Sequence, residues 1–216
     1  MKIKKPNITV ASESVTDLYP VLETVREDET AVCEIEIKNV RMSGEDMSKM
    51  DFRSVIFDGC KLTDCDFSKS SFMDVQFKNC DFSNSRFNEA YFKYCEWVST
   101  KWMGARCCDS VITHWTAKNC NFQYTNFDHT AFSYVRVDAC DFSHGMLSGC
   151  PMKEFSVGEC RFIETNFFRT RLKNLDFSDS ELAGIIVSDT NEELEGAVVN
   201  TWQAVELARL LKVIVK

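Results

Sequence analysis

The chain has 216 residues, a hydrophobic fraction of 44% and a formal net charge of −8. Its length and composition suit one globular domain, and no run of about 18 apolar residues predicts a membrane span. The negative charge balance disfavours direct binding of nucleic acid through a basic surface.

The cysteine usage points to a reducing compartment. The chain contains 11 Cys, an odd number, and its basic first residues are not followed by a signal-peptide core. It has no CxxC or HxxxH pair, so no zinc motif is recognisable. These features predict reduced thiols in a cytoplasmic protein with no metal site and no cofactor.

Residues 1–32 show no regular hydrophobic period. Within them, SESVTDLYPVLETVREDE (residues 12–29) predicts a short helix that is interrupted near Pro20. Because a repeat architecture exposes open strand edges at its ends, we expect residues 1–32 to form an N-terminal cap.

A five-residue repeat follows. From Ile37 to Val187 every fifth residue is apolar, and 15 of the 17 Phe fall on this register. A helix face repeats every 3.6 residues and a strand every 2, so neither element explains the spacing. The period predicts a repeating coil and defines residues 33–189 as one repeat domain.

A second, longer period shows how the coil closes. The residues two places before the register positions fall into four classes, and each class recurs in every fourth pentapeptide. One class is mainly Cys and another is bulky: Cys60, Cys80, Thr100, Cys120, Cys140 and Cys160, and Val55, Val75, Cys95, Trp115, Val135, Phe155 and Leu175. Four pentapeptides therefore complete one turn, which predicts a square coil. We interpret the Cys as small buried residues, with redox or metal-ligand roles as the alternative.

The sizes of neighbouring inward residues support this square coil. The large Trp115 accompanies the small register residue Ala117, whereas the small Cys95 accompanies the large Trp97. Interiors are close-packed, so two side chains that share one volume should trade size.

Stretches such as CDFSK (65–69), CDFSN (80–84), CDFSH (140–144) and LDFSD (175–179) resemble the pentapeptide-repeat family, whose pattern is A-(D/N)-(L/F)-x-x. Cys often stands at the family's Ala position. The resemblance implies an all-β fold, a right-handed quadrilateral β-helix, which agrees with the square coil. At a coil spacing of ~4.8 Å, about eight coils make a rod roughly 38 Å long.

Residues 190–216 leave the register. Asn200 and Gln203 fit a capping box that starts a helix near Thr201, and VIV at 213–215 predicts a short strand. The apolar surface is broad, so this segment either only covers the last coil or also grips a second copy. We predict a homodimer interface at Trp202, Val205, Leu207, Leu210, Leu211, Val213, Ile214 and Val215.

The three His are each separated by three pentapeptides, which places them on different sides of the square. No catalytic triad can be assembled, so we expect no enzyme. One column, with a member in every fourth pentapeptide, is predicted to stack: Asp74, Tyr94, His114, Tyr134 and Glu154, with Tyr124 and His144 on the next side. Such a column is either a ladder that stabilises the coil or a partner-binding surface.

Within the family, the rod length, the uninterrupted register and the C-terminal helix are similar to the quinolone-resistance (Qnr-type) group. The resemblance implies a head-to-head homodimer that binds DNA gyrase and topoisomerase IV, mimics duplex DNA and protects against quinolones. Two rods would span roughly 75 Å, or about 22 base pairs. Basic residues such as Lys78, Lys93 and Arg161 predict a patchy mimic, and an interaction scaffold with another partner is the alternative.

Overall fold

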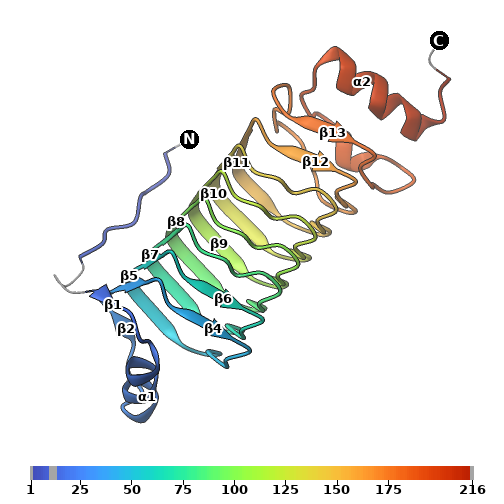
Figure 1. Cartoon of the computed structure of the whole chain (residues 1–216). Helices are drawn as coiled ribbons and strands as arrows, with labels where there is room; N and C mark the ends of the chain where they lie inside the picture. The colour runs from blue at the N-terminus through green and yellow to red at the C-terminus, as the bar shows by residue number, and fades with distance from the viewer. Residues whose placement is uncertain (1, 10–13, 215–216) are drawn as a thin grey trace.

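The protein is a β-solenoid of about eight coils with a short helix near each end, shown as a computed structural model in Figure 1. The structure describes residues 2–9 and 14–214. Strand partners such as Phe72 and Phe92 pair in parallel and are separated by four pentapeptides, so each coil takes four of these units. The predicted quadrilateral β-helix is confirmed.

The longest strands form a nine-stranded sheet in the order β1-β3-β5-β7-β8-β9-β10-β11, with β2 also paired to β5. Two smaller sheets pair β4 with β6 and β12 with β13. Isolated bridges with the same separation of four pentapeptides continue the ladder between coils. The strands are β1 (Ser14–Val15), β2 (Val32–Cys33), β3 (Glu36–Lys38), β4 (Arg41–Ser43), β5 (Asp51–Asp58), β6 (Lys61–Thr63), β7 (Ser71–Lys78), β8 (Tyr91–Val98), β9 (Val111–Lys118), β10 (Ala131–Asp138), β11 (Met152–Gly158), β12 (Arg161–Ile163) and β13 (Glu181–Ala183).

The corners of the coil use left-handed backbone. Residues two places after the register positions have positive φ, for example 57° at Asp74 and 56° at Tyr94. Both lie in the middle of eight-residue strands, where the chain bends from one side of the square to the next. The repeat therefore turns a side chain outward at each of these corners.

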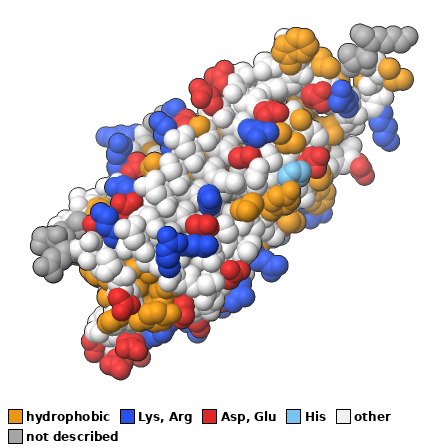
Figure 2. All heavy atoms as spheres, in the orientation of Figure 1, with side chains coloured by type: hydrophobic (Ala, Val, Ile, Leu, Met, Phe, Trp, Pro, Cys, Tyr) orange, Lys and Arg blue, Asp and Glu red, His pale blue; other side chains and the backbone are white. Residues whose placement is uncertain are grey.

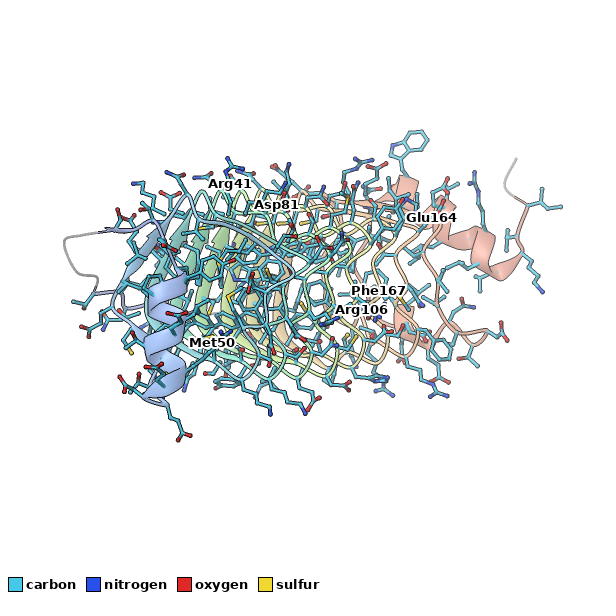
Figure 3. The ribbon with its side chains drawn as sticks, turned by 60° about the horizontal axis from the view of Figure 1, so that its bottom comes forward. Arg41, Met50, Asp81, Arg106, Glu164 and Phe167 are labelled. Atoms are coloured by element: carbon cyan, nitrogen blue, oxygen red, sulfur yellow. The ribbon has the colours of Figure 1, made fainter. Side chains whose placement is uncertain are left out.

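The register residues fill the interior as continuous stacks. Phe52, Phe72 and Phe92 lie above one another, with ring centroids 4.9 Å and 4.7 Å apart and nearly parallel planes. Nearly all register residues are buried; Met152, Val157 and Val187 are only partly so. Figure 3 shows this arrangement, with Phe167 pointing inward and Arg41 and Asp81 on the outside.

An exchange of size also occurs between adjacent coils. Cys95 is the strand partner of Trp115, and Trp97 is the partner of Ala117. The two indoles meet edge to face, with ring centroids 4.7 Å apart. Each large side chain therefore lies over a small one, which keeps the coil spacing uniform.

The stacking is interrupted on one side near the C-terminal end. Strand β11 ends the nine-stranded sheet, and residues 172–177 bond instead to the backbone of Glu193, Gly196 and Val198. Met152 and Val157 on β11 are consequently only partly buried. The sequence register is unbroken through Val187, so the period alone does not reveal this open edge.

At the N-terminal end, helix α1 (Tyr19–Glu27) places Pro20 in its first turn. The prediction that Pro20 interrupts the helix is wrong, because proline is tolerated where the amide has no helical acceptor. Leu18 and Leu22 are buried against the first coil. The cap is thus built by α1 and its flanks, whereas residues 2–9 run along the rod (Figure 1).

At the other end the solenoid continues beyond the five-residue register. A short 3-10 helix, η1 (Glu192–Leu194), comes first. Val198 then pairs with Asp176, although the regular spacing of four pentapeptides would place the partner of Asp176 two residues earlier in the chain. The partial coil therefore reaches past the predicted boundary at residue 189. The side chain of Glu193 is buried and accepts hydrogen bonds from Ser188 and from the backbone amide of Arg169.

Helix α2 (Thr201–Ala208) starts at the predicted capping box. The Asn200 and Gln203 side chains each accept the other's backbone amide, at 3.0 Å and 2.8 Å. A 3-10 turn, η2 (Arg209–Leu211), follows. The strand predicted at 213–215 is wrong for residues 213–214, which form no strand, and Val215 lies outside the described residues.

Candidate protein-interaction surfaces

The column of corner residues predicted to stack does so. Tyr94 and His114 have ring centroids 5.2 Å apart, and His114 and Tyr134 follow at 4.7 Å with an interplanar angle of 13°. We call this column the corner ladder; its residues, from the N-terminal end, are Ser54, Asp74, Tyr94, His114, Tyr134 and Glu154.

The backbone at the corner ladder disfavours large side chains. Tyr94, His114 and Tyr134 have φ between 51° and 56°, a region that costs a bulky residue roughly 1–3 kcal/mol. Each stacked aromatic pair contributes about 0.5–1.5 kcal/mol of stability, which offsets only part of that cost. The same left-handed backbone occurs at the corners occupied by Lys49, Glu89 and Arg169, so its cost does not distinguish a stabilising ladder from a partner-binding surface.

The N-terminal segment, residues 2–9, lies on the corner ladder. Figure 1 shows it running beside the rod. The amide of Asn7 donates to Asp74 Oδ1 at 2.8 Å, and the amide of Lys4 donates to His114 Nδ1 at 3.3 Å. Thr9 is bonded twice, because Ser54 Oγ accepts its amide at 2.7 Å and donates to its carbonyl at 3.1 Å.

Two ammonium groups flank the aromatic part of the ladder. Lys4 Nζ lies 5.8 Å from the ring centroid of Tyr94, and Lys93 Nζ lies 5.1 Å from it. Burial, and then these two positive charges, lower the pKa of His114 below its ordinary value. His114 is therefore mainly neutral near neutral pH, which leaves Nδ1 free to accept from Lys4.

A second ladder on another corner consists of Tyr124 and His144. Their ring centroids are 4.8 Å apart and the planes are within 8° of parallel. His144 Nδ1 also lies 3.2 Å from a carboxylate oxygen of Glu164. Tyr124 is 57% exposed, whereas Tyr94 and Tyr134 are partly buried. Both ladders have stacked rings, but Tyr124 of the second ladder is more exposed to solvent than Tyr94 and Tyr134.

The C-terminal segment divides the predicted dimer residues into two groups. Leu207 and Leu210 pack on the core, and Val205 is partly buried. Trp202 and Ile214 are 83% and 85% exposed, and Leu211 and Val213 are also exposed. The exposed group forms an uncovered apolar surface at the end of the rod.

Next to this surface, an apolar groove of about 360 Å³ runs between α2 and the last partial coil. Its lining residues are Asn191, Leu194, Ala197, Val199, Ala204, Leu207, Ala208, Leu210 and Leu211. Leu211 belongs both to the lining of this groove and to the exposed apolar group.

Acidic and basic side chains alternate along the rod. Arg161 lies 3.6 Å from Asp141 and 3.0 Å from Glu181, which belong to the coils on either side, and Arg86 pairs with Asp66 at 2.8 Å. Figure 2 shows red and blue side chains mixed over the visible face. That face carries no continuous acidic stripe, which fits the predicted patchy charge.

The 11 Cys are free thiols, and nine of them, including Cys107 in the register, are buried. Burial raises the pKa of Cys95 to about 12. Hydrogen bonding to Cys60, followed by burial, raises the pKa of Cys80 well above its ordinary value. The thiol of Cys160 donates to the carbonyl of Val137 in the previous coil at 3.6 Å. These contacts support the structural interpretation of the Cys column over a redox role.

No group of three or more His, Cys, Asp or Glu side chains is arranged to hold a metal ion within residues 2–9 and 14–214. Of the helices described in the structure, none has the length and apolar character to cross a membrane.

Comparison with known proteins identifies the repeat. A family model for pentapeptide repeats (9 copies) matches residues 52–96. This stretch matches the pentapeptide-repeat family, and the chain has the pentapeptide-repeat fold. No match was found among curated proteins.

Two solved structures are similar to this chain. Trypsin-treated QnrB1, a plasmid-mediated fluoroquinolone resistance protein, is 22% identical with a TM-score of 0.50, and the match covers 84% of this chain and 90% of QnrB1. HetL, a pentapeptide-repeat protein involved in heterocyst differentiation regulation in the cyanobacterium Nostoc, is 11% identical with a TM-score of 0.53, and 81% of each chain is covered. At these identities the similarity concerns the fold.

The sequence predicted the stacking of the corner ladder but not the segment that lies on it. The N-terminal segment has no repeat register, and its contacts use backbone amides, which leave no signature in residue types. Ser54 was also missed as the first member of the ladder, although its separation of four pentapeptides from Asp74 is visible in the sequence. Gln203 was expected only as a capping residue, yet its amide also donates to the carbonyl of Phe177 at 2.7 Å.

Proposed function

We propose that this pentapeptide-repeat protein is a non-catalytic interaction rod that binds DNA gyrase and topoisomerase IV, mimics duplex DNA and protects these enzymes from quinolones. The observation that carries the proposal is the shared solenoid with QnrB1, which extends over 90% of QnrB1. The sequence resemblance to the Qnr-type group supports it independently. The protein is proposed to act in the cytoplasm, where these topoisomerases are found, and without contacting DNA itself.

The proposed active form is a homodimer joined through the C-terminal segments. Trp202, Leu211, Val213 and Ile214 are exposed at one end of the rod, next to an apolar groove. Exposed apolar surface of this kind is typical of an interface with another chain. A head-to-head pair would reach roughly 75 Å, comparable to about 22 base pairs of duplex.

A DNA gyrase supercoiling assay with ciprofloxacin, with and without the protein, tests the proposed partner. We expect the protein at micromolar concentration to restore supercoiling that the drug suppresses, or to inhibit the enzyme by competing with DNA. The absence of both effects, on gyrase and on topoisomerase IV, would refute this function.

A surface variant tests the paired rod. The double substitution Trp202→Glu and Ile214→Glu places charges on the exposed apolar surface and leaves Leu207 and Leu210 on the core. We expect a monomer by light scattering, an unchanged circular dichroism spectrum and at least tenfold weaker gyrase binding. Tyr124→Glu, also at an exposed aromatic but in the middle of the rod, is the matched control and should remain dimeric.

The second candidate function is an interaction scaffold with a partner other than a topoisomerase. The mixture of acidic and basic side chains on the visible face favours it, because a DNA mimic should present a more continuous negative surface (Figure 2). HetL illustrates that a similar solenoid serves a different process. A gyrase pull-down that fails under conditions in which the dimer is intact would favour this candidate.

A further inference from the structure

The contacts between the N-terminal segment and the corner ladder have the pattern of peptide recognition. Three side chains of the ladder accept backbone amides of the segment: Ser54 that of Thr9, Asp74 that of Asn7 and His114 that of Lys4. Backbone contacts bind an extended chain whatever its sequence. The ladder thus supplies a row of acceptors, roughly one coil spacing apart, to a peptide that runs along the rod.

Side chains of the segment add chemical preference. Ile3, Pro6 and Ile8 are partly buried, whereas the Lys residues of the segment are exposed. Lys4 nevertheless makes a specific contact, because its ammonium group lies over the face of Tyr94, and the aromatic ring attracts a cation there. The preferred occupant is therefore extended, apolar on the side facing the rod and equipped with a lysine near Tyr94.

The segment is attached in a way that permits exchange. It forms no helix or strand, and none of residues 2–9 belongs to the buried core. By contrast, β1 (Ser14–Val15) pairs with β3 inside the nine-stranded sheet. Individual hydrogen bonds contribute only modestly because each replaces a bond to water. A competing peptide needs to displace a few surface contacts only.

The second ladder provides the contrast within the same molecule. Tyr124 and His144 stack as closely as the rings of the corner ladder, yet no residue of the described N-terminal segment bonds to them. Stacked aromatic rings alone therefore do not attract the segment. The acceptor row of Ser54, Asp74 and His114 distinguishes the occupied ladder from the empty one.

We propose that the corner ladder is a binding site for an extended, lysine-bearing peptide segment of a partner protein, and that residues 2–9 mask this site in the free protein. The proposal rests on the proposed function only in taking the protein to be an interaction rod. Masking lowers the apparent affinity for the partner in proportion to the fraction of molecules with the segment bound. A tethered segment that itself binds with a Kd of about 100 μM, at an effective concentration on the order of 1 mM, weakens the binding of a competing peptide about tenfold.

Fluorescence anisotropy with a labelled synthetic peptide, KIKKPNIT, tests the site. This peptide reproduces residues 2–9. A variant lacking residues 2–9 should bind the peptide, and the full chain should bind it at least tenfold more weakly. A full-chain variant, Asn7→Pro, removes the amide that donates to Asp74 and should bind the peptide more tightly than the unaltered chain.

Substitutions in the shortened chain locate the site. Tyr94→Ala and His114→Ala should each weaken peptide binding at least fivefold, whereas Tyr124→Ala in the second ladder should leave it unchanged. Circular dichroism checks that each variant keeps the β-solenoid.

Absence of peptide binding to the folded shortened chain would overturn the proposal, as would equal binding by the full and shortened chains. Equal losses from Tyr94→Ala and Tyr124→Ala would also overturn it, because binding would then not depend on the corner ladder. Gyrase is not a component of these measurements. A protein that binds the peptide but has no effect on gyrase would refute the proposed topoisomerase partner and leave the masked site standing.

Discussion

The middle of the rod and the C-terminal segment are both rich in apolar residues, but they use them differently. In the middle, a register residue such as Phe127 is fully buried because coils stack on both sides of it. In the C-terminal segment, Trp202 and Ile214 are exposed and lie beyond the last coil of the described residues. Apolar content alone therefore does not produce a core; burial depends on a neighbouring coil.

The largest expected difference concerns the thiols. Cys120, Cys140 and Cys160 are buried inside the rod, whereas Cys33 near its N-terminal end is exposed. A native stability of at least about 5 kcal/mol limits opening of the rod, so the buried thiols should react at least 10³-fold more slowly than Cys33. Mass spectrometry after timed labelling with a thiol reagent measures the difference. Comparable rates at all four sites would mean that the Cys column faces outward.

Truncation of a core ring should cost more than truncation of a surface ring. Phe127→Ala opens a cavity between stacked coils and should lower the free energy of unfolding by ~3–5 kcal/mol. Phe168→Ala is the control: that ring is 38% exposed and packs beside the Arg169 guanidinium at 5.0 Å. Its loss should cost about 1 kcal/mol. Chemical denaturation compares the two, and equal costs would contradict the five-residue register.

Two adjacent residues of α2 have different roles. One attaches the helix to the last coil, and the other lies on its outer surface. Gln203 is buried, caps the helix and donates to the carbonyls of Phe177 and Ser180. Gln203→Leu should lower the free energy of unfolding by about 1–3 kcal/mol, because buried carbonyls lose their donor.

Trp202→Ala, at its exposed neighbour, should change that free energy by less than about 0.5 kcal/mol at a concentration where the protein is monomeric. Thermal unfolding of both variants measures the contrast. A larger effect at Trp202 would indicate that its ring packs on the rod instead of facing a second copy.

The smallest expected effect is a pH dependence of the N-terminal segment. Because the pKa of His114 is lowered in the folded protein, by burial and then by Lys4 and Lys93, the neutral form favours the bound segment. This contribution is fully present above the ordinary His pKa of about 6.5 and is lost as the pH falls through the lowered value. Protonation removes the Nδ1 acceptor and adds a third positive charge beside Tyr94.

Amide hydrogen exchange at Asn7, corrected for the intrinsic effect of pH, should therefore show less protection at pH 5.5 than at pH 7.5. His114→Ala should abolish the difference, whereas His144→Ala in the second ladder should preserve it. A pH response that survives His114→Ala would show that another group controls the segment.

The sequence by itself determined the repeat and its consequences. The five-residue period, the four recurring classes of inward residue and the exchange of size between Cys95–Trp97 and Trp115–Ala117 specify a square coil, because each coil contacts mainly its neighbours. The stack of Tyr94, His114 and Tyr134 follows from the same spacing. The capping box at Asn200 and Gln203 is equally local, so it was predictable from residue types.

Only the tertiary structure decided what happens where the repeat ends. The partial coil through Val198 is shifted by two positions, which removes it from any search for a period of five. Pro20 is tolerated in the first turn of α1 because the amides at that position have no acceptor within the helix. The N-terminal segment reaches the corner ladder through backbone amides, for which every residue except proline is chemically equivalent. Local periodicity encodes contacts between repeats, whereas contacts made by the backbone over long distances appear only in the folded chain.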